Sequence, residues 1–245
     1  MQGLTSLFKR ELYAFLISPT AAIFTIAFLL TSTAFTIYIG QFFERDQADM
    51  LSFFRFVPWL CIIFAPALAM RTWSEELRIG TLELLHSLPI TPWALIMAKF
   101  LSLWLVGVFS IALSFPIWLV ISYLGEPDHM MVMSGYVGSF LLMGGYLAIT
   151  QALSIFTRNQ ILALVPGIAI CFIMTVPGAQ VFMGYVQPFL SNSMMDMIAG
   201  LSFLLHYENF TRGVIDLRSV LYFLIFIASC LVITRMGLER QSTGG

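Results

Sequence analysis

The chain has 245 residues, of which 59% are hydrophobic and only 10% are charged, and its formal net charge is −1. Soluble domains carry about 45–50% apolar and about 25% charged residues, so this composition excludes a soluble globular protein and a disordered one. The near-neutral charge also excludes a basic face for nucleic acid. We therefore expect an all-α polytopic membrane protein with one domain over residues 1–245.

The N-terminal segment, residues 1–18, is predicted to form an amphipathic helix in the cytoplasmic interface. Its apolar residues share one helical face, and they are Leu4, Leu7, Phe8, Leu12 and Phe15. Lys9, Arg10 and Glu11 are expected to lie off that stripe, and Pro19 to turn the chain into the membrane. The alternative is that this segment forms the soluble beginning of the first span.

Six segments are apolar for roughly the 20 residues that a spanning helix needs. They cover residues 20–41, 56–71, 94–124, 133–156, 160–183 and 218–235. The third is long, and Pro116 is expected to kink it. The stretch 187–205 is too polar for a lipid-exposed span, so short re-entrant or interfacial helices are predicted over residues 184–212.

The distribution of lysine and arginine predicts that both termini are cytoplasmic. Eight basic residues would lie inside: Lys9, Arg10, Arg71, Arg78, Lys99, Arg158, Arg235 and Arg240. Four would lie outside: Arg45, Arg55, Arg212 and Arg218. Lys99 is interpreted as an anchor of this positive-inside kind.

Small residues recur four apart along the fourth span, at Ser134 and Gly138 and again at Gly144, Ala148 and Ala152. This spacing lets helix backbones approach closely. Packing within the chain is the favoured interpretation, and a subunit interface is the alternative.

The loop over residues 72–92 contains the densest group of charges in the chain. Glu75, Glu76, Arg78 and Glu83 fall within nine residues. Gly80 or Thr81 is expected to cap a short helix over residues 82–87, which Pro89 and Pro92 bound. A short charged helix on the cytoplasmic face would suit docking into a groove of a partner protein.

The run R-x-x-x-E-E-x-R-x-G-T-L-E-L-L, which begins at Arg71, resembles the signature of ABC-2 type permeases, the membrane subunits of one class of ATP-binding-cassette transporters. The segment from His206 to Tyr222 resembles the stretch that enters the last span in that family. The branch that it resembles most includes the gliding-motility-associated permeases and the permease of nitrous-oxide-reductase maturation. Leu77 departs from the pattern, because a basic residue is common there.

The resemblance implies that the loop helix couples the permease to an ATPase. The residues implied at or beside that interface are Glu75, Glu76, Arg78, Gly80, Thr81, Leu82, Glu83 and Leu85. It also implies an outer-side structural motif made of His206, Glu208, Asn209, Phe210, Arg212, Gly213 and Asp216. Glu208, Arg212 and Asp216 lie four apart, and we expect them to share one helix face and hold the outer segment together.

No G-x-x-x-x-G-K-[ST] motif occurs, so the chain is not expected to bind nucleotide or to act as an enzyme. No metal site is expected from its three histidines. The resemblance places ATP and Mg²⁺ on a cytoplasmic ATPase dimer, beside a second permease subunit. It further implies export, a bacterial inner membrane and, as other partners, lipid and a periplasmic accessory protein.

Two other classes of protein remain as alternatives. An ion-coupled secondary transporter would need ionisable residues within its spans, which are nearly free of them here. An intramembrane protease would use the paired glutamates Glu75 and Glu76 with a histidine inside the membrane. His129 and His206, however, are predicted in outer loops. Cargo and direction are not readable from the sequence.

Overall fold

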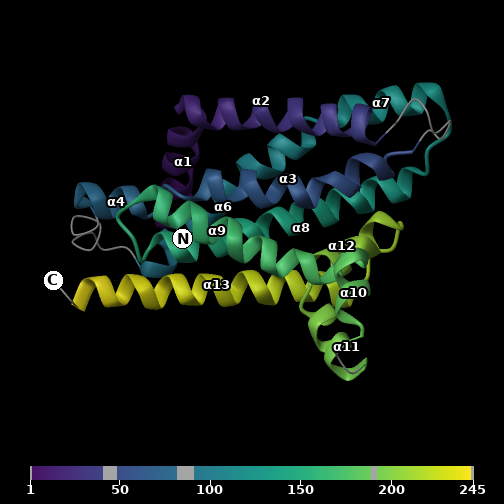
Figure 1. Ribbon diagram of the computed structural model, residues 1–245. Helices are drawn as coiled ribbons and strands as arrows, with labels where there is room; N and C mark the ends of the chain where they lie inside the picture. Colours follow the sequence, from purple (N-terminus) through teal and green to yellow (C-terminus); the bar gives the residue numbers. More distant parts are fainter. Residues whose placement is uncertain (1, 41–48, 82–90, 189–191, 244–245) are drawn as a thin grey trace.

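Helices form the regular structure throughout the residues that the computed structural model describes, namely 2–40, 49–81, 91–188 and 192–243 (Figure 1). Within these ranges no strand occurs, which confirms the all-α class. In chain order the helices are α1 Gln2–Ile17, α2 Pro19–Ala34, η1 Phe35–Ile39, α3 Leu51–Ala69, α4 Ser74–Ile79, α6 Pro92–Ala112, α7 Phe115–Leu124, α8 His129–Ser154, α9 Gln160–Thr175, η2 Val176–Gly178, α10 Gln180–Val186, α11 Asn192–Gly200, α12 Phe203–Thr211 and α13 Leu217–Thr243.

Six of these helical stretches are long and apolar enough to cross a membrane, as predicted. They are Pro19–Ile39, Leu51–Ile79, Pro92–Leu124, His129–Ser154, Gln160–Gly178 and Leu217–Gln241. The second and last run beyond their predicted ends, because α4 follows α3 after a short turn and α13 continues past residue 235. The helices α10, α11 and α12 have 7, 9 and 9 residues, too few to span a bilayer.

Helix α8 lies at the centre of the bundle, where it packs against α3, α6, α9, α12 and α13. Its small residues make this possible. A Cβ on Gly138 would lie 2.6 Å from the Cβ of Phe210, and one on Gly144 would lie 3.1 Å from the Trp104 indole nitrogen. Ala148 is fully buried. The small-residue spacing therefore serves packing within the chain, which confirms the favoured interpretation.

The third span is broken between α6 and α7, as the kink at Pro116 predicted. The break falls at Leu113 and Ser114, two residues before the proline. Pro116 lacks an N–H and its ring would collide with the preceding turn, so it is tolerated only in the first turn of a new helix. Ser114 stabilises the break, because its hydroxyl donates to the Ile111 carbonyl at 2.6 Å and contacts the Tyr136 hydroxyl at 2.9 Å.

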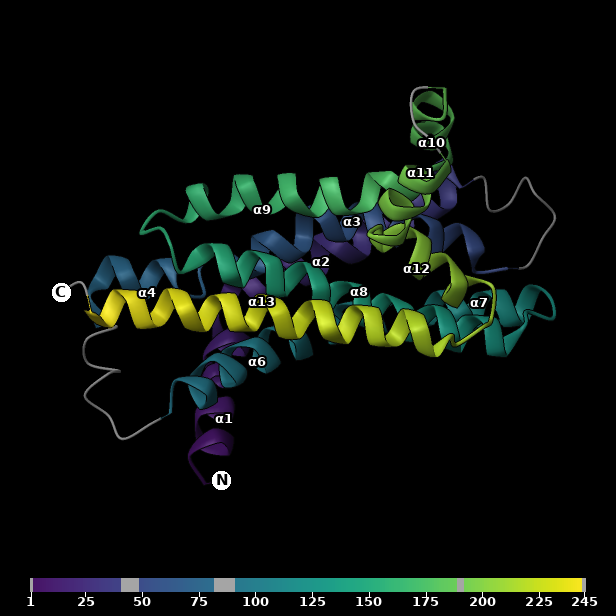
Figure 2. The same cartoon turned by 90° about the horizontal axis from the view of Figure 1, so that it is seen from below.

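Helix α1 runs across the spans rather than parallel to them (Figure 2). Ser18 caps the start of α2, with Pro19 in its first turn, so the chain turns at the predicted place. Leu7 is buried, and Phe8 and Phe15 pack against the core, so these three members of the predicted apolar stripe face the bundle. Glu11 was expected off the apolar stripe, and that expectation is wrong. It lies four residues from both Leu7 and Phe15, and its side chain is only 12% exposed.

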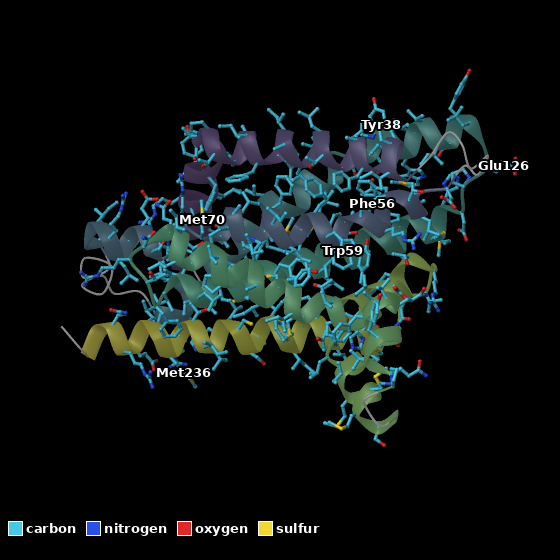
Figure 3. The ribbon with its side chains drawn as sticks, viewed as in Figure 1. Tyr38, Phe56, Trp59, Met70, Glu126 and Met236 are labelled. Atoms are coloured by element: carbon cyan, nitrogen blue, oxygen red, sulfur yellow. The ribbon has the colours of Figure 1, made fainter. Side chains whose placement is uncertain are left out.

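The bundle has two chemically different ends. Helices α1 and α4 and the C-terminal end of α13 lie toward one end, which we call the inner end (Figures 1 and 2). The outer end carries α7, α10, α11 and α12. Figure 3 labels residues at both ends, with Met70 and Met236 toward the inner end and Tyr38 and Glu126 toward the outer end. The described parts of both predicted functional segments therefore lie at ends of the bundle rather than halfway along it.

Candidate functional site

Residues 71–81 form a compact feature at the inner end, which we call the α4 corner. It contains α4, whose first turn holds Glu75 and Glu76 and whose last turn holds Arg78. This order matches the helix dipole, which favours anions at the N-terminus and cations at the C-terminus. Gly80 has φ of 79° and ends α4 in the left-handed conformation that glycine adopts without strain. It thus terminates α4, a role that was not predicted.

The side chains of Glu75 and Arg78 are the exposed part of the α4 corner. Their facing atoms, Glu75 Oε1 and an Arg78 guanidinium nitrogen, lie 3.4 Å apart, and the side chains are 39% and 60% exposed. Gln160, at the start of α9, accepts from Arg71 Nε at 3.1 Å and donates to Glu75 Oε2 at 3.4 Å. Gln160 therefore ties the corner to α9 while leaving a mixed pair of charges accessible to a partner.

The side chain of Glu76, unlike that of Glu75, points into the protein. Its Oε1 is 2.6 Å from Nζ of Lys99, which in turn is 3.2 Å from Oε2 of Glu11. The Lys99 side chain is only 5% exposed. The three charged groups come from α4, α6 and α1. Lys99 is therefore a buried ion-pair partner of two carboxylates, and the anchor interpretation misses this role.

The surroundings of Lys99 are largely apolar. Its ammonium lies 5.3 Å from the ring centroid of Trp73, a side chain that is fully buried. Cation–π attraction adds to the two ion pairs here. Burial by itself would raise the pKa of Glu11, but Lys99 and Arg10 together hold that pKa below its ordinary value. Among the described residues, Glu76 Oε2 and Trp73 Nε1 are buried without a hydrogen-bond partner.

The structure describes only part of the predicted coupling segment. Leu82, Glu83 and Leu85, together with the helix expected over residues 82–87, lie outside the described residues. Thr81 is helical and half-buried at the edge of the described range. Leu77, where the family pattern often has a basic residue, packs against the hydrophobic core. An apolar side chain at this position is therefore explained by its contacts.

The outer-side motif joins α12 to α13 through the hydroxyl of Ser219, a fully buried residue. Asn209 Nδ2 donates to this oxygen at 3.0 Å, and Nδ1 of His206 lies 3.3 Å from it. Nε2 of His206 lies 3.1 Å from the Gly200 carbonyl, and its ring stacks on Tyr222 with centroids 4.0 Å apart. His206 and Asn209 thus both contact Ser219, and His206 also contacts Gly200 and Tyr222.

The expectation that Glu208, Arg212 and Asp216 share one helix face is wrong for Asp216. Glu208 and Arg212 do face each other, at 3.6 Å. Helix α12 ends at Thr211, and Gly213 then reverses the chain with φ of 83°. Asp216 instead directly precedes α13, and its carboxylate accepts from the backbone N–H of Arg218 at 3.1 Å. The glycine interrupts the helical spacing on which the expectation depended.

Phe210 and Tyr207 fasten the outer motif to the bundle. The Phe210 ring packs on Gly138, and its carbonyl accepts from the Ser134 hydroxyl. Tyr207 was not singled out from the sequence. Its hydroxyl donates to the Phe54 carbonyl at 3.0 Å, and four residues beyond Phe54 stands Pro58, which has no N–H. Tyr207 and Phe54 are 153 positions apart, so this pairing could be recognised only from the fold.

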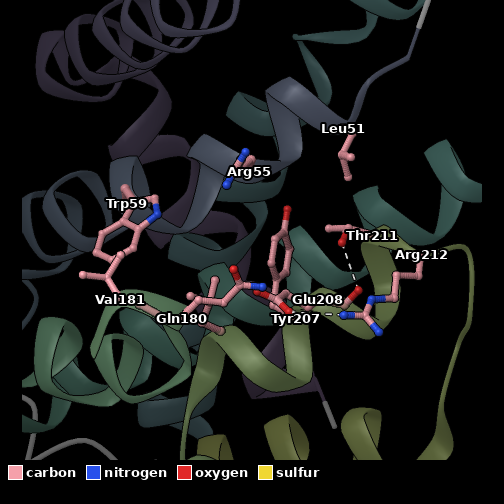
Figure 4. A pocket seen from close by; sticks show the side chains of 11 residues that line it. Leu51, Arg55, Trp59, Gln180, Val181, Tyr207, Glu208, Thr211 and Arg212 are labelled. Atoms are coloured by element: carbon pink, nitrogen blue, oxygen red, sulfur yellow. Dashed lines mark hydrogen bonds and ion pairs between the residues drawn. The ribbon is translucent and has the colours of Figure 1, made fainter. Parts of the chain in front are cut away.

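A cleft of about 460 Å³ opens beside this motif at the outer end (Figure 4). Residues of α3, α10, α12 and the adjoining turns line it, and they are Leu51, Arg55, Trp59, Ala179, Gln180, Val181, Leu204, Tyr207, Glu208, Thr211 and Arg212. Most of the lining is apolar. Arg55 on α3 and Arg212 beyond α12 stand on different sides of it (Figure 4). Such a cleft suits an amphiphile, with apolar contacts for a chain and guanidinium groups for an anionic head.

Within the described parts of the chain, no group of three or more histidine, cysteine, aspartate and glutamate side chains could hold a metal ion. A comparison with curated proteins found no match. A comparison with known protein families matches residues 5–241 to the family described as ABC-2 family transporter protein. This match covers both end motifs and all six candidate spans. The chain therefore belongs to the ABC-2 family of transporter proteins, which supplies membrane components of ABC transporters.

Proposed function

We propose that this chain is the permease subunit of an ABC transporter, driven by ATP hydrolysis on separate ATPase subunits. The observation that carries the proposal is the α4 corner, which presents Glu75 and Arg78 at one end of a bundle of the ABC-2 family. Two permease chains would pair with a cytoplasmic ATPase dimer, which would hold ATP and Mg²⁺. The closest functional branch would be that of the gliding-motility and nitrous-oxide-reductase maturation permeases.

The charge distribution supports a cytoplasmic inner end. Arg71 and Arg78 belong to the α4 corner, and Arg235 and Arg240 lie in the final turns of α13 at the same end. Positive charge retained on the cytoplasmic side sets the orientation of membrane proteins. Helix α1 would then lie in the cytoplasmic interface, its exposed Lys9 and Arg10 facing the anionic leaflet. In a bacterium this membrane would be the inner one.

The outer end supports an export role. Helices α10 to α12 would form the external closure between two permease chains, and the neighbouring cleft would receive an amphiphilic cargo with an anionic head. Arg55 and Arg212 would contact that head, while Trp59 and Val181 would contact the chain. A periplasmic accessory protein could then take the cargo from this end, and lipid would cover the exposed apolar faces.

Co-purification with a co-expressed ABC ATPase tests the proposal directly. We expect Glu75→Lys to lower the amount of ATPase retained by the purified permease, because it places two like charges together at the exposed corner. Glu126→Lys is the matched control, since Glu126 is an exposed acid at the opposite end (Figure 3). Equal retention by both variants and the wild type would remove the α4 corner from the interface.

A further inference from the structure

The chain of charges Glu11–Lys99–Glu76 connects three elements that are otherwise joined mainly by apolar contact. Helix α4 packs chiefly on α9, whereas α1 packs on α6. Lys99, on α6, bridges these two groups of helices, with its ammonium 2.6 Å from Glu76 and 3.2 Å from Glu11. Any movement of α4 relative to α6 therefore changes the distance between buried opposite charges.

Burial makes this connection costly to break. Exposed ion pairs are screened by water and contribute little, but removal of one member of a buried pair leaves an uncompensated charge at high cost. Lys99 is 5% exposed and Glu76 and Glu11 are 19% and 12% exposed, so water cannot easily replace either partner.

The two neighbouring glutamates of α4 therefore have different surroundings. Glu75 is 39% exposed and contacts Arg78 and Gln160 at the surface, while Glu76 points inward to Lys99. Consecutive residues of a helix point about 100° apart, so one short helix can face a partner with one glutamate and the bundle with the other.

We propose that Glu11, Lys99 and Glu76 form a joint that transmits movement of the α4 corner to α1 and α6, and that Glu76 is a positioning residue rather than a contact to the ATPase. This inference rests on the proposed function. In the proposed function, the ATPase contacts Glu75 and Arg78 and displaces the α4 corner. The joint then moves the interfacial helix and the third span together, instead of letting α4 swing alone.

The first test separates docking from transmission, with Glu75→Gln and Glu76→Gln as matched variants on one turn of α4. We expect Glu76→Gln and Lys99→Met to lower permease-stimulated ATP hydrolysis per bound ATPase by about fivefold or more, the size of an ordinary coupling factor. ATPase retention should stay near the wild-type level. The double variant Glu76→Gln/Lys99→Met should be no worse than either single variant, and Lys99→Arg should retain most of the stimulation.

Two outcomes of that test would overturn the joint. Glu76→Gln could lower ATPase retention while hydrolysis per bound ATPase stays normal, which would make Glu76 a docking residue. Alternatively, the effects of Glu76→Gln and Lys99→Met could simply add, which would mean that the two groups act independently. Thermal unfolding of each purified variant identifies any loss that comes from misfolding.

A second test needs no ATPase, so it distinguishes failure of the joint from failure of the proposed function. Spin labels at Tyr13→Cys on α1 and Ile79→Cys on α4 would occupy exposed positions, because Tyr13 is 68% exposed and Ile79 is 61% exposed. We expect a narrow distance distribution in wild-type permease alone and a broader one in Lys99→Met, with Arg158→Met as the surface control. Identical distributions in all three proteins would refute the joint. If the distance distribution broadens in Lys99→Met but the wild-type permease binds no ATPase, only the proposed function is refuted.

Discussion

Replacement of Tyr207 by phenylalanine should destabilise the protein, because the buried Phe54 carbonyl loses its hydrogen-bond donor. The Tyr207 side chain is 1% exposed, and burial raises its pKa, so the hydroxyl stays protonated and can donate to Phe54. Pro58 cannot supply the helical N–H that this carbonyl would otherwise accept. The substitution leaves the ring in place, so it creates almost no cavity and isolates the lost hydrogen bond.

The expected cost is about 1–2 kcal/mol in the free energy of unfolding. A buried acceptor left without a partner costs about 1–3 kcal/mol, while hydrogen bonds between helices in membrane proteins average below 1 kcal/mol. Ser139, which lies 3.0 Å from the Tyr207 hydroxyl, keeps its own bond to the Gly135 carbonyl at 2.7 Å. Loss of the Phe54 bond should therefore dominate the measured change.

The decisive assay is a double-mutant cycle with Pro58→Ala, measured by reversible unfolding in mixed micelles. Alanine at position 58 restores an N–H four residues beyond Phe54, so Tyr207→Phe should cost less than about 0.5 kcal/mol in that background. Tyr123→Phe is the control, because that side chain is 91% exposed. An equal cost of Tyr207→Phe with and without Pro58 would refute the reasoning.

Three further measurements test other parts of the structure. Gly138→Ala should lower the free energy of unfolding by about 1–3 kcal/mol, because its methyl would collide with the Phe210 side chain of α12. Gly184→Ala is the control, since a Cβ there meets nothing within 4 Å and should not destabilise the protein. The stabilisation by Glu11 should be present at neutral pH and lost as the pH falls through its lowered pKa; unfolding of Glu11→Gln should lack that acidic decline. Arg55→Glu should reduce co-purified anionic lipid in native mass spectrometry, and equal loss from Arg218→Glu, outside the cleft, would contradict a specific site.

The membrane spans could be predicted because each depends on local composition. A bilayer demands about 20 apolar residues, and that requirement can be read from any window of the sequence. The break near Pro116 and the turn at Pro19 were predictable for a similar reason, since proline acts on its own turn. Gly213 shows the limit of this reasoning, because one left-handed residue moved Asp216 from the predicted face of α12 to the start of α13.

The partners of the charged residues could not be predicted, because they lie far apart in sequence. Lys99 and Glu11 are 88 positions apart, and nothing local to either indicates the other. Two weak signals were nevertheless present. Lys99 is one of only two lysines, and Glu11 shares the four-residue spacing of Leu7 and Phe15. The docking roles of Glu75 and Glu76 stay predictions, while the structure shows that these neighbouring side chains have different partners.

The two ends of the bundle are held by different kinds of interaction, and this difference bears on which end can move. Coulomb attraction falls only as the inverse of distance, so an increase from 2.6 to 3.6 Å between Glu76 and Lys99 would keep about three quarters of it. The neutral hydrogen bonds around Ser219 weaken steeply with distance and angle. A small displacement would therefore be carried through the inner charges without breaking them, whereas at Ser219 it would break the bonds between α12 and α13. Under the proposed joint, movement would enter at the α4 corner, and the bonds at Ser219 would survive only if α12 and α13 moved together.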